Sequence, residues 1–223
     1  GDEYVRTNAI TQTKDGGILT CGAIWSVTGQ WEPYVMKLNN CGVKEWCKIF
    51  TGSVKDNPWA EDIFELKNEE IFVLVNQWGT DNIEDLFLFK ISSTGEVLWK
   101  KPVCSGIIHP QSAIAIGRSI EEINQSKYII TGSVYWAHPW NPGGPKGLRS
   151  LFTMIDSSGS ELWVLPFGLN DTILGNAHHS IQIGENDFIG VGRAVGQDVS
   201  REGIIMRFDS LGNEIDYKRF NFQ

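Results

Sequence analysis

A short pattern recurs four times along the 223-residue chain. It consists of an apolar residue, a small polar residue, two further residues, Gly, three further residues and Trp. It occurs as LNNCGVKEW, ISSTGEVLW and IDSSGSELW, and as FDSLGNEIDY with the aromatic residue one place late. The glycines lie 53, 64 and 53 residues apart, at Gly42, Gly95, Gly159 and Gly212. A period near 50 is typical of propeller-type repeats, whose units cannot bury both faces alone and must stack.

Each repeat holds four short runs rich in β-branched and aromatic residues, separated by Gly, Asn and Asp. In the first repeat they are AITQT, GILTCGAI, PYVMKL and KEWCKIF. Such runs predict antiparallel strands joined by tight turns. We therefore predict an all-β fold in one domain over residues 1–223, a β-propeller of four blades with four antiparallel strands each. The alternative is a segment of a larger propeller.

The repeats also set the expected limits of the blades, at residues 3–50, 59–103, 111–167 and 177–220. In the third blade we interpret Gly117–Ser126, GRSIEEINQS, as an extended connection between the first two strands. Trp46, Trp99 and Trp163 recur at a fixed distance from the turn Gly, which predicts that they pack between blades. Trp25 and Trp78 recur at a second fixed position, and we interpret them as packing residues too.

Charge and cysteine content exclude several classes of function. The formal net charge is −8, whereas a nucleic-acid backbone or an anionic membrane surface requires a basic face. No apolar run approaches the roughly 18 residues of a membrane span, so no membrane insertion is expected. The four cysteines form no CxxC pair, which argues against a structural zinc site. We expect neither a metal nor a cofactor.

The segments DGGIL and LFKISSTGEVLWKK resemble the PQQ-quinoprotein-like or kelch-like propeller repeats of bacterial surface proteins. The resemblance recurs once per blade and implies a β-propeller in a secreted or cell-surface protein, with a role in binding or adhesion. The chain departs from the repeat at Glu69–Glu70, where two glycines are lost, and at Asp216, where the Trp is lost. Nothing in it matches the quinone-binding residues of quinoprotein dehydrogenases, so that cofactor is not carried over.

In a four-stranded meander, the connections between second and third strands and between blades leave from one end of the sheet. Here those connections vary in length and composition, whereas the turns at the other end are short and uniform. Variable loops on a rigid scaffold usually carry binding sites. This end also collects all four histidines and several tryptophans without a counterpart in other blades, among them Trp31, Trp59, Trp136 and Trp140. We predict that a ligand binds there, between the loop WAHPWNPGGPKG and the channel mouth. Trp136 and Trp140 would stack on it, His138 and His178 would supply hydrogen bonds, and His109 lies on the same face.

The first strand of each blade lines the channel of a propeller, and polar residues lie near its expected entrance. They are Asn8, Glu61, Asp62, Gln111, Ser112, His178 and His179. Such a ring could bind a sugar or a cation, or simply hold water. Glu61 and Asp62 are adjacent, so we expect them on opposite faces of their strand, unable to form one acid/base pair. His178 and His179 lack a spaced third metal ligand.

These observations favour a non-enzymatic binding module for a carbohydrate or protein ligand, on a secreted or surface protein. The predicted ligand-binding residues are Trp31, Trp59, Glu61, Asp62, His109, Trp136, His138, Trp140, His178 and His179. No catalytic residue is predicted, since GxSxG, P-loop and HExxH motifs are absent. One alternative is a small glycan-active enzyme with its site at the channel mouth. Another is a structural segment that packs on further blades or on a partner domain.

Overall fold

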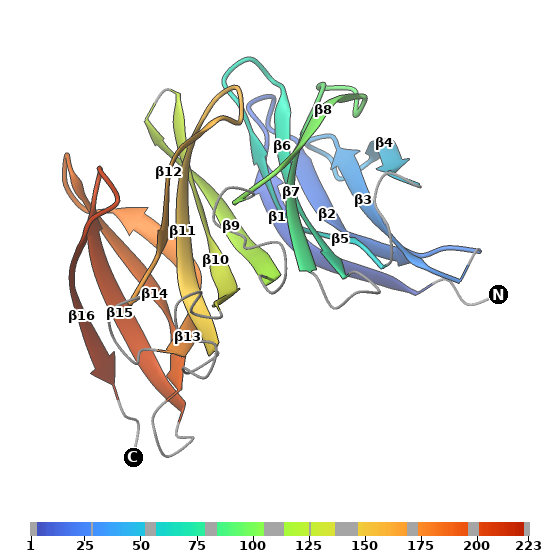
Figure 1. Cartoon of the computed structure of the whole chain (residues 1–223). Helices are drawn as coiled ribbons and strands as arrows, with labels where there is room; N and C mark the ends of the chain where they lie inside the picture. The colour runs from blue at the N-terminus through green and yellow to red at the C-terminus, as the bar shows by residue number, and fades with distance from the viewer. Residues whose placement is uncertain are drawn as a thin grey trace. The chain divides into compact units, whose positions relative to one another are not determined.

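The computed structural model describes residues 4–27, 29–51, 57–78, 84–104, 114–124, 126–136, 147–168, 174–195 and 201–220. The regular structure of these residues is entirely β-strand, in sixteen strands that form four antiparallel sheets of four (Figure 1). The predicted all-β class with four four-stranded blades is confirmed. Within the described part of the chain, no helix is long and apolar enough to cross a membrane.

Contacts divide the chain into two compact units, Gly1–Val103 and Cys104–Gln223. Unit 1 holds blades one and two. Blade one comprises β1 (Val5–Gln12), β2 (Ile18–Trp25), β3 (Trp31–Leu38) and β4 (Lys44–Ile49), and blade two comprises β5 (Trp59–Glu65), β6 (Ile71–Trp78), β7 (Glu84–Ile91) and β8 (Val97–Pro102). In both blades the strands pair in sequence order, as a meander.

Unit 2 holds blades three and four, again as meanders. Blade three comprises β9 (Ile114–Asn124), β10 (Lys127–Trp136), β11 (Gly147–Asp156) and β12 (Glu161–Pro166), and blade four comprises β13 (Leu174–Gln182), β14 (Asp187–Val195), β15 (Arg201–Asp209) and β16 (Glu214–Phe220). The interpretation of Gly117–Ser126 as a connection is wrong, because its residues up to Asn124 belong to β9 and pair with β10. The apolar residues Ile116, Ile120 and Ile123 are four and three places apart, so the sequence shows no period-two pattern over this strand.

In each unit, one face of the first blade's sheet packs against the second blade. The first strand of the second blade lies across that face. β5 packs across β1, β2 and β3, and β13 packs across β9, β10 and β11. The unit 1 core between the blades includes Leu19, Cys21, Val35, Ile71, Val73 and Phe89. The unit 2 core includes Phe152, Met154, Phe188, Met206 and Phe208. Because alternate residues of a strand point to opposite faces, the period-two apolar pattern of the sequence supplies these facing surfaces.

A tryptophan closes the rim of each described blade contact. Trp46 packs against the unit 1 core and Trp163 against the unit 2 core. The Trp163 indole N–H donates to the Ser210 carbonyl oxygen in blade four at 2.9 Å. Both rings therefore pack between blades, as predicted. Trp99 lies 5.8 Å from the Phe72 ring of its own blade, measured between centroids.

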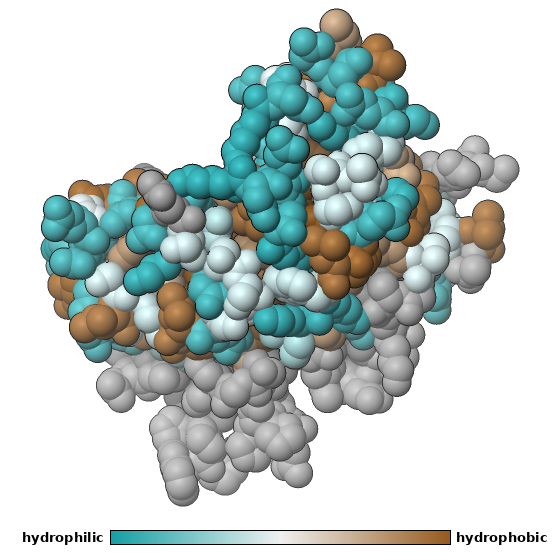
Figure 2. All heavy atoms as spheres, turned by 90° about the horizontal axis from the view of Figure 1, so that it is seen from above, coloured by the Kyte–Doolittle hydropathy of each residue, from teal (hydrophilic) through white to brown (hydrophobic). Residues whose placement is uncertain are grey.

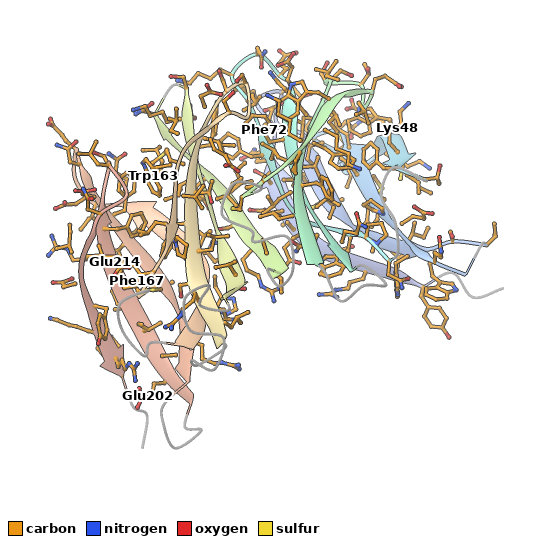
Figure 3. All side chains as sticks on the ribbon, in the orientation of Figure 1. Lys48, Phe72, Trp163, Phe167, Glu202 and Glu214 are labelled. Carbon is orange, nitrogen blue, oxygen red and sulfur yellow. The ribbon has the colours of Figure 1, made fainter. Side chains whose placement is uncertain are left out.

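A glutamate adds a second tie between blades three and four. The Gly168 N–H, just after β12, donates to Glu214 Oε1 on β16 at 2.6 Å. Figure 3 labels Glu214 together with Trp163 and Phe167 of blade three. Glu161, at the equivalent place in blade three, accepts the N–H of Cys104. The end of β12 is thus completed by a carboxylate from the next blade of the same unit.

The turn glycines differ in what surrounds them, and this gives a test of the blade contact. Gly42 and Gly95 both have positive φ, 76° and 84°. A Cβ on Gly95 would lie 3.0 Å from the Trp46 ring and 2.6 Å from Cγ of Lys48, whereas a Cβ on Gly42 would meet nothing within 4 Å. Both positions require the left-handed backbone, but only Gly95 must also accommodate a ring.

We expect Gly42→Ala to cost about 1–2 kcal/mol of unfolding free energy, from the backbone conformation alone. Gly95→Ala should cost about 1–3 kcal/mol more, because the methyl group displaces Trp46. Urea unfolding of the two variants measures the difference. Equal losses would show that Trp46 does not press on the turn of blade two.

Candidate functional site

An aromatic row crosses the tip of blade one, at the end where β2 and β3 are connected. Trp25 and Trp31 are cross-strand partners, with ring centroids 5.4 Å apart in an edge-to-face arrangement. Trp25 N–H donates to the Tyr4 carbonyl oxygen at 2.8 Å, so Tyr4, which directly precedes β1, continues the row. Tyr4 is 64% exposed, Trp25 is 38% exposed and Trp31 is half-buried. We call Tyr4, Trp25 and Trp31 the aromatic row.

A polar group lies at the same end of unit 1, around the start of β5. The Trp59 indole N–H donates to Glu61 Oε2 at 2.6 Å, and the side-chain amide of Asn76 lies 3.4 Å from the same oxygen. Asn57, which precedes β5 with a positive φ of 49°, accepts the Trp31 N–H at 3.3 Å. This last bond ties the aromatic row to the segment that carries Trp59. The structure therefore brings the predicted residues Trp31, Trp59 and Glu61 to one end of one unit.

The first strand of every blade has a register shift that leaves one extra residue. These residues are Asn8, Glu61, Arg118 and His178. In unit 1 the Asn8 side-chain amide donates to the Ala60 carbonyl oxygen at 2.8 Å, beside the extra residue of blade two. The sequence pointed to Asn8, Glu61 and His178, but it placed the third blade's entry at Gln111 and Ser112, which lie outside the described residues. Arg118 was missed because the length of β9 was not recognised.

The register shift of blade two lies at Glu61 and Asp62, which we expected on opposite faces of their strand. Strict alternation would put adjacent side chains on opposite faces, but the shift between Ala60 and Asp62 interrupts it. Burial raises the pKa of the Cys21 thiol, and the charges of Asp62 and Glu61 raise it further. The expectation that the two side chains lie on opposite faces of the strand stays a prediction.

In unit 2 the corresponding strand presents two exposed histidines, His178 and His179. His179 Nδ1 lies 4.0 Å from Glu121 Oε1, on the first strand of blade three. Burial raises the pKa of Glu121, and the His179 charge opposes that shift. Glu121 and Glu122 follow Arg118 on β9, and these charged groups lie with the two histidines along the first strands of unit 2.

The raised pKa of Glu121 predicts the pH dependence of stability. A carboxyl with a raised pKa binds more protons in the native state, so stability falls as pH rises from the ordinary value of 4.5 through the folded pKa. Glu121→Gln removes that penalty. The variant should therefore melt at a slightly higher temperature than the parent at pH 7, with the gap closing towards pH 4. Thermal unfolding across this range measures it, with Glu185→Gln in an exposed turn as control. A gap that widens towards pH 4 would contradict the assignment.

Several predicted residues lie outside the described part of the structure. They are His109, His138 and Trp140, with most of the loop WAHPWNPGGPKG. Trp136 ends β10, and its side chain is not described. The placement of a ligand beside this loop therefore stays a prediction. Conversely, Tyr4, Trp25, Asn57 and Asn76 were not predicted. Trp25 was assigned to packing because it recurs, yet it is exposed, and the other three have no distinctive sequence signal.

The opposite end of unit 1 holds a small polar pocket of about 90 Å³. It is lined by Thr13, Lys14, Asp15, Leu19, Lys37, Glu65, Glu69, Ile71 and Ser93. Its lysines already have partners: Lys37 pairs with Asp15 and Glu45, and Lys14 Nζ donates to the Leu66 carbonyl oxygen. The hydrogen bond from Lys37 lowers the pKa of Asp15 well below its usual range. Figure 2 looks onto this end of the strands, where hydrophilic side chains occupy much of the surface.

No protein-family model matches the chain, and no curated protein matches it either. Solved structures do. An ulvan lyase of polysaccharide lyase family 25 matches with a TM-score of 0.54 at 12% identity, over 98% of this chain and 56% of that one. A eukaryotic initiation factor matches with a TM-score of 0.42 at 9% identity, over 96% and 55%. The N-terminal domain of Nup159 matches with a TM-score of 0.36 at 8% identity, over 94% and 51%.

These likenesses concern the fold. The chain spans about half the length of the solved structures it matches. The four-stranded sheets and the ulvan lyase match support the β-propeller class. The sequence resemblance to a particular repeat family, the single domain and the alternative of a larger propeller stay predictions.

Proposed function

We propose that the chain is a non-enzymatic carbohydrate-binding module of a secreted or surface protein, with its binding surface at the aromatic row of unit 1. The secreted or surface location is supported by the resemblance of its repeats to those of bacterial surface proteins. The observation that carries the proposal is the pairing of Trp25 and Trp31 at an exposed blade tip. Exposed aromatic rings in one row are costly in water unless a ligand covers them.

The chemistry of the surface suits a neutral sugar. The apolar faces of pyranose rings stack on indole and phenol rings, which supply contact area with little loss of side-chain freedom. Directed hydrogen bonds then fix the orientation of the hydroxyl groups. Asn57 provides an amide group that is bonded to the Trp31 main chain, and the half-buried Glu61 provides a carboxylate at the same end of the unit. The net charge of −8 disfavours an anionic ligand.

The cross-strand geometry makes the row a preformed platform. Trp25 and Trp31 stand on paired strands of a four-stranded sheet, and the Trp31 main chain is bonded to Asn57. A surface held in this way loses little conformational entropy when a ligand binds, which favours affinity.

A small glycan-active enzyme is the second candidate, because one observation favours it. Glu61 and Asp62 are adjacent on β5, where a register shift interrupts the regular alternation of side chains. A glycosidase requires two carboxyl groups on either side of the scissile bond. Turnover of a bound glycan separates this candidate from the binding module.

The test is a screen of immobilised neutral glycans, followed by calorimetry and a product assay on any glycan that binds. Trp25→Ala should weaken binding about thirtyfold, because truncating an aromatic anchor typically costs about 2 kcal/mol. The fold should persist, since the Trp25 ring is exposed. Tyr217→Ala removes an equally exposed aromatic ring, 38% in both cases, from β16 of unit 2 and serves as the matched control.

Three outcomes decide the proposal. Loss of binding with Trp25→Ala and Trp31→Ala, but not with Tyr217→Ala, supports the aromatic row. Unchanged binding in both Trp variants contradicts it. Release of cleaved glycan that depends on Glu61 or Asp62 would replace the binding module with the enzyme.

A further inference from the structure

The aromatic row runs across the direction of the strands in blade one. Trp25 at the end of β2 is the register partner of Trp31 at the start of β3. The pairing of Val5 with Ile24 places Tyr4 opposite Trp25, and the Trp25 N–H bond to the Tyr4 carbonyl oxygen agrees with this register. Residues directly opposite in an antiparallel sheet point to the same face. The three aromatic side chains therefore stand in one line on one face.

That face belongs wholly to unit 1. Side chains two residues apart on a strand share a face, so Trp25 lies on the same side of β2 as Leu19 and Cys21. Leu19 and Cys21 are part of the core that blade one shares with blade two. The row therefore occupies the outer end of the face that packs on blade two.

The pairing of two aromatic residues is specific to blade one. The corresponding pairs between the ends of the second and third strands are Trp78 with Glu84 in blade two, Trp136 with Gly147 in blade three and Val195 with Arg201 in blade four. A structural role common to the blades would require the second aromatic residue in each of them. The repeat therefore does not account for Trp31.

The connection between the two tryptophans is short and closed by backbone hydrogen bonds. Ser26 N–H donates to the Gln30 carbonyl oxygen at 2.8 Å, and Gly29 N–H donates to the Ser26 carbonyl oxygen at 3.0 Å. Gly29 has the positive φ, 77°, that glycine adopts most easily. With the bond from Trp31 N–H to Asn57, this loop holds the backbone beneath both rings. The angle between the rings is therefore a built feature of the blade tip.

That angle restricts the shape of a ligand. The ring planes of Trp25 and Trp31 are inclined by 77°, with centroids 5.4 Å apart. A sugar ring stacks with its apolar face parallel to the aromatic ring that it covers. Two planes at nearly a right angle cannot both be parallel to one flat surface. The pair therefore suits a glycan chain whose consecutive rings turn relative to one another, and it does not suit a flat ribbon or a crystalline polysaccharide surface.

The spacing of the row restricts the length of the ligand. Neighbouring strands of a sheet lie about 4.8 Å apart, which is close to the length of one sugar unit in a glycan chain. Aromatic side chains at three successive strand positions thus match three consecutive units. Trp31 is half-buried, Trp25 is 38% exposed and Tyr4 is 64% exposed. The unit at Trp31 is therefore the most enclosed of the three, and the unit at Tyr4 is the most accessible.

We propose that the row binds a single, linear, neutral glycan chain of coiled form through three consecutive sugar units. Malto- and laminari-oligosaccharides have this form, because their linkages turn each ring relative to the one before. Cello-oligosaccharides form a flat ribbon. The inference rests on the proposed function of the row and adds the class and length of its ligand.

The experiment is calorimetry of the whole chain with malto-, laminari- and cello-oligosaccharides of one to six units. Affinity for at least one of the two coiled series should rise about tenfold with each added unit up to the third, and then level off. Cello-oligosaccharides of the same length should bind at least about tenfold more weakly. The chain should also fail to sediment with microcrystalline cellulose, since a flat surface cannot cover both indoles.

Tyr4→Ala tests the third subsite. The variant should lose the gain from the second to the third unit, about tenfold, and should bind the disaccharide like the parent. Val5→Ala is the matched control, because the next residue along a strand points to the opposite face of the sheet. It should show the same dependence on chain length as the parent. Circular dichroism of both variants checks that the fold is retained.

Each contrary result has a distinct meaning. A monosaccharide that binds as tightly as the trisaccharide would overturn the three-unit chain, while glycan binding at the row would stand. Tighter binding of cello-oligosaccharides than of both coiled series, or no binding of either coiled series, would overturn the coiled form. A Tyr4→Ala variant that keeps the third step would overturn the role of Tyr4. Binding that persists in both Trp25→Ala and Trp31→Ala contradicts the proposed function itself, so the two failures are distinguishable.

Discussion

The packing of one sheet face on the next blade is the interaction on which the remainder of this structure depends. A four-stranded sheet of short strands has two faces, and each blade can cover only one face of its neighbour. The chain meets this constraint with apolar residues at the centre of the contact, largely aliphatic in unit 1 and largely Phe and Met in unit 2, and with a Trp at its rim. Trp163 shows both parts of the rim contact, since its ring lies on Gly212 and its N–H reaches Ser210. The turn glycine therefore serves the contact in two ways. It adopts the positive φ of the turn, and its lack of a side chain leaves space for the Trp ring.

The repeat allowed the number of blades, the order of strands and the roles of Trp46 and Trp163 to be predicted from sequence. These features depend on local alternation and on turn chemistry, which the residues themselves carry. The first strand of blade three was misjudged because Arg118, Glu121 and Glu122 interrupt its apolar pattern. The register shifts were not foreseen either, since a single extra residue leaves no mark in a strand of mixed character.

The candidate site could be predicted from the sequence only in part. Trp31 and Trp59 were identified because they break the repeat, and they do lie at one end of unit 1. Trp25 was not identified, because its recurrence in the second blade predicts a packing residue. Its exposure follows from its position at the end of β2, beyond the reach of the core that covers Leu19 and Cys21 on the same face. A period in sequence thus reports position in a blade, whereas burial depends on how far the neighbouring blade extends.

The carboxylate of Glu214 has a consequence for how unit 2 loses its structure. The N–H of Gly168, at the end of blade three, is satisfied only while β16 of blade four is in place. Fraying of the last strand of the unit therefore also releases the end of the preceding blade, in addition to uncovering Trp163. Such shared bonds make neighbouring blades a single cooperative unit, in which local opening is suppressed until both blades open together. Amide protons at the blade boundary then exchange with solvent at the rate of the pair rather than of one sheet.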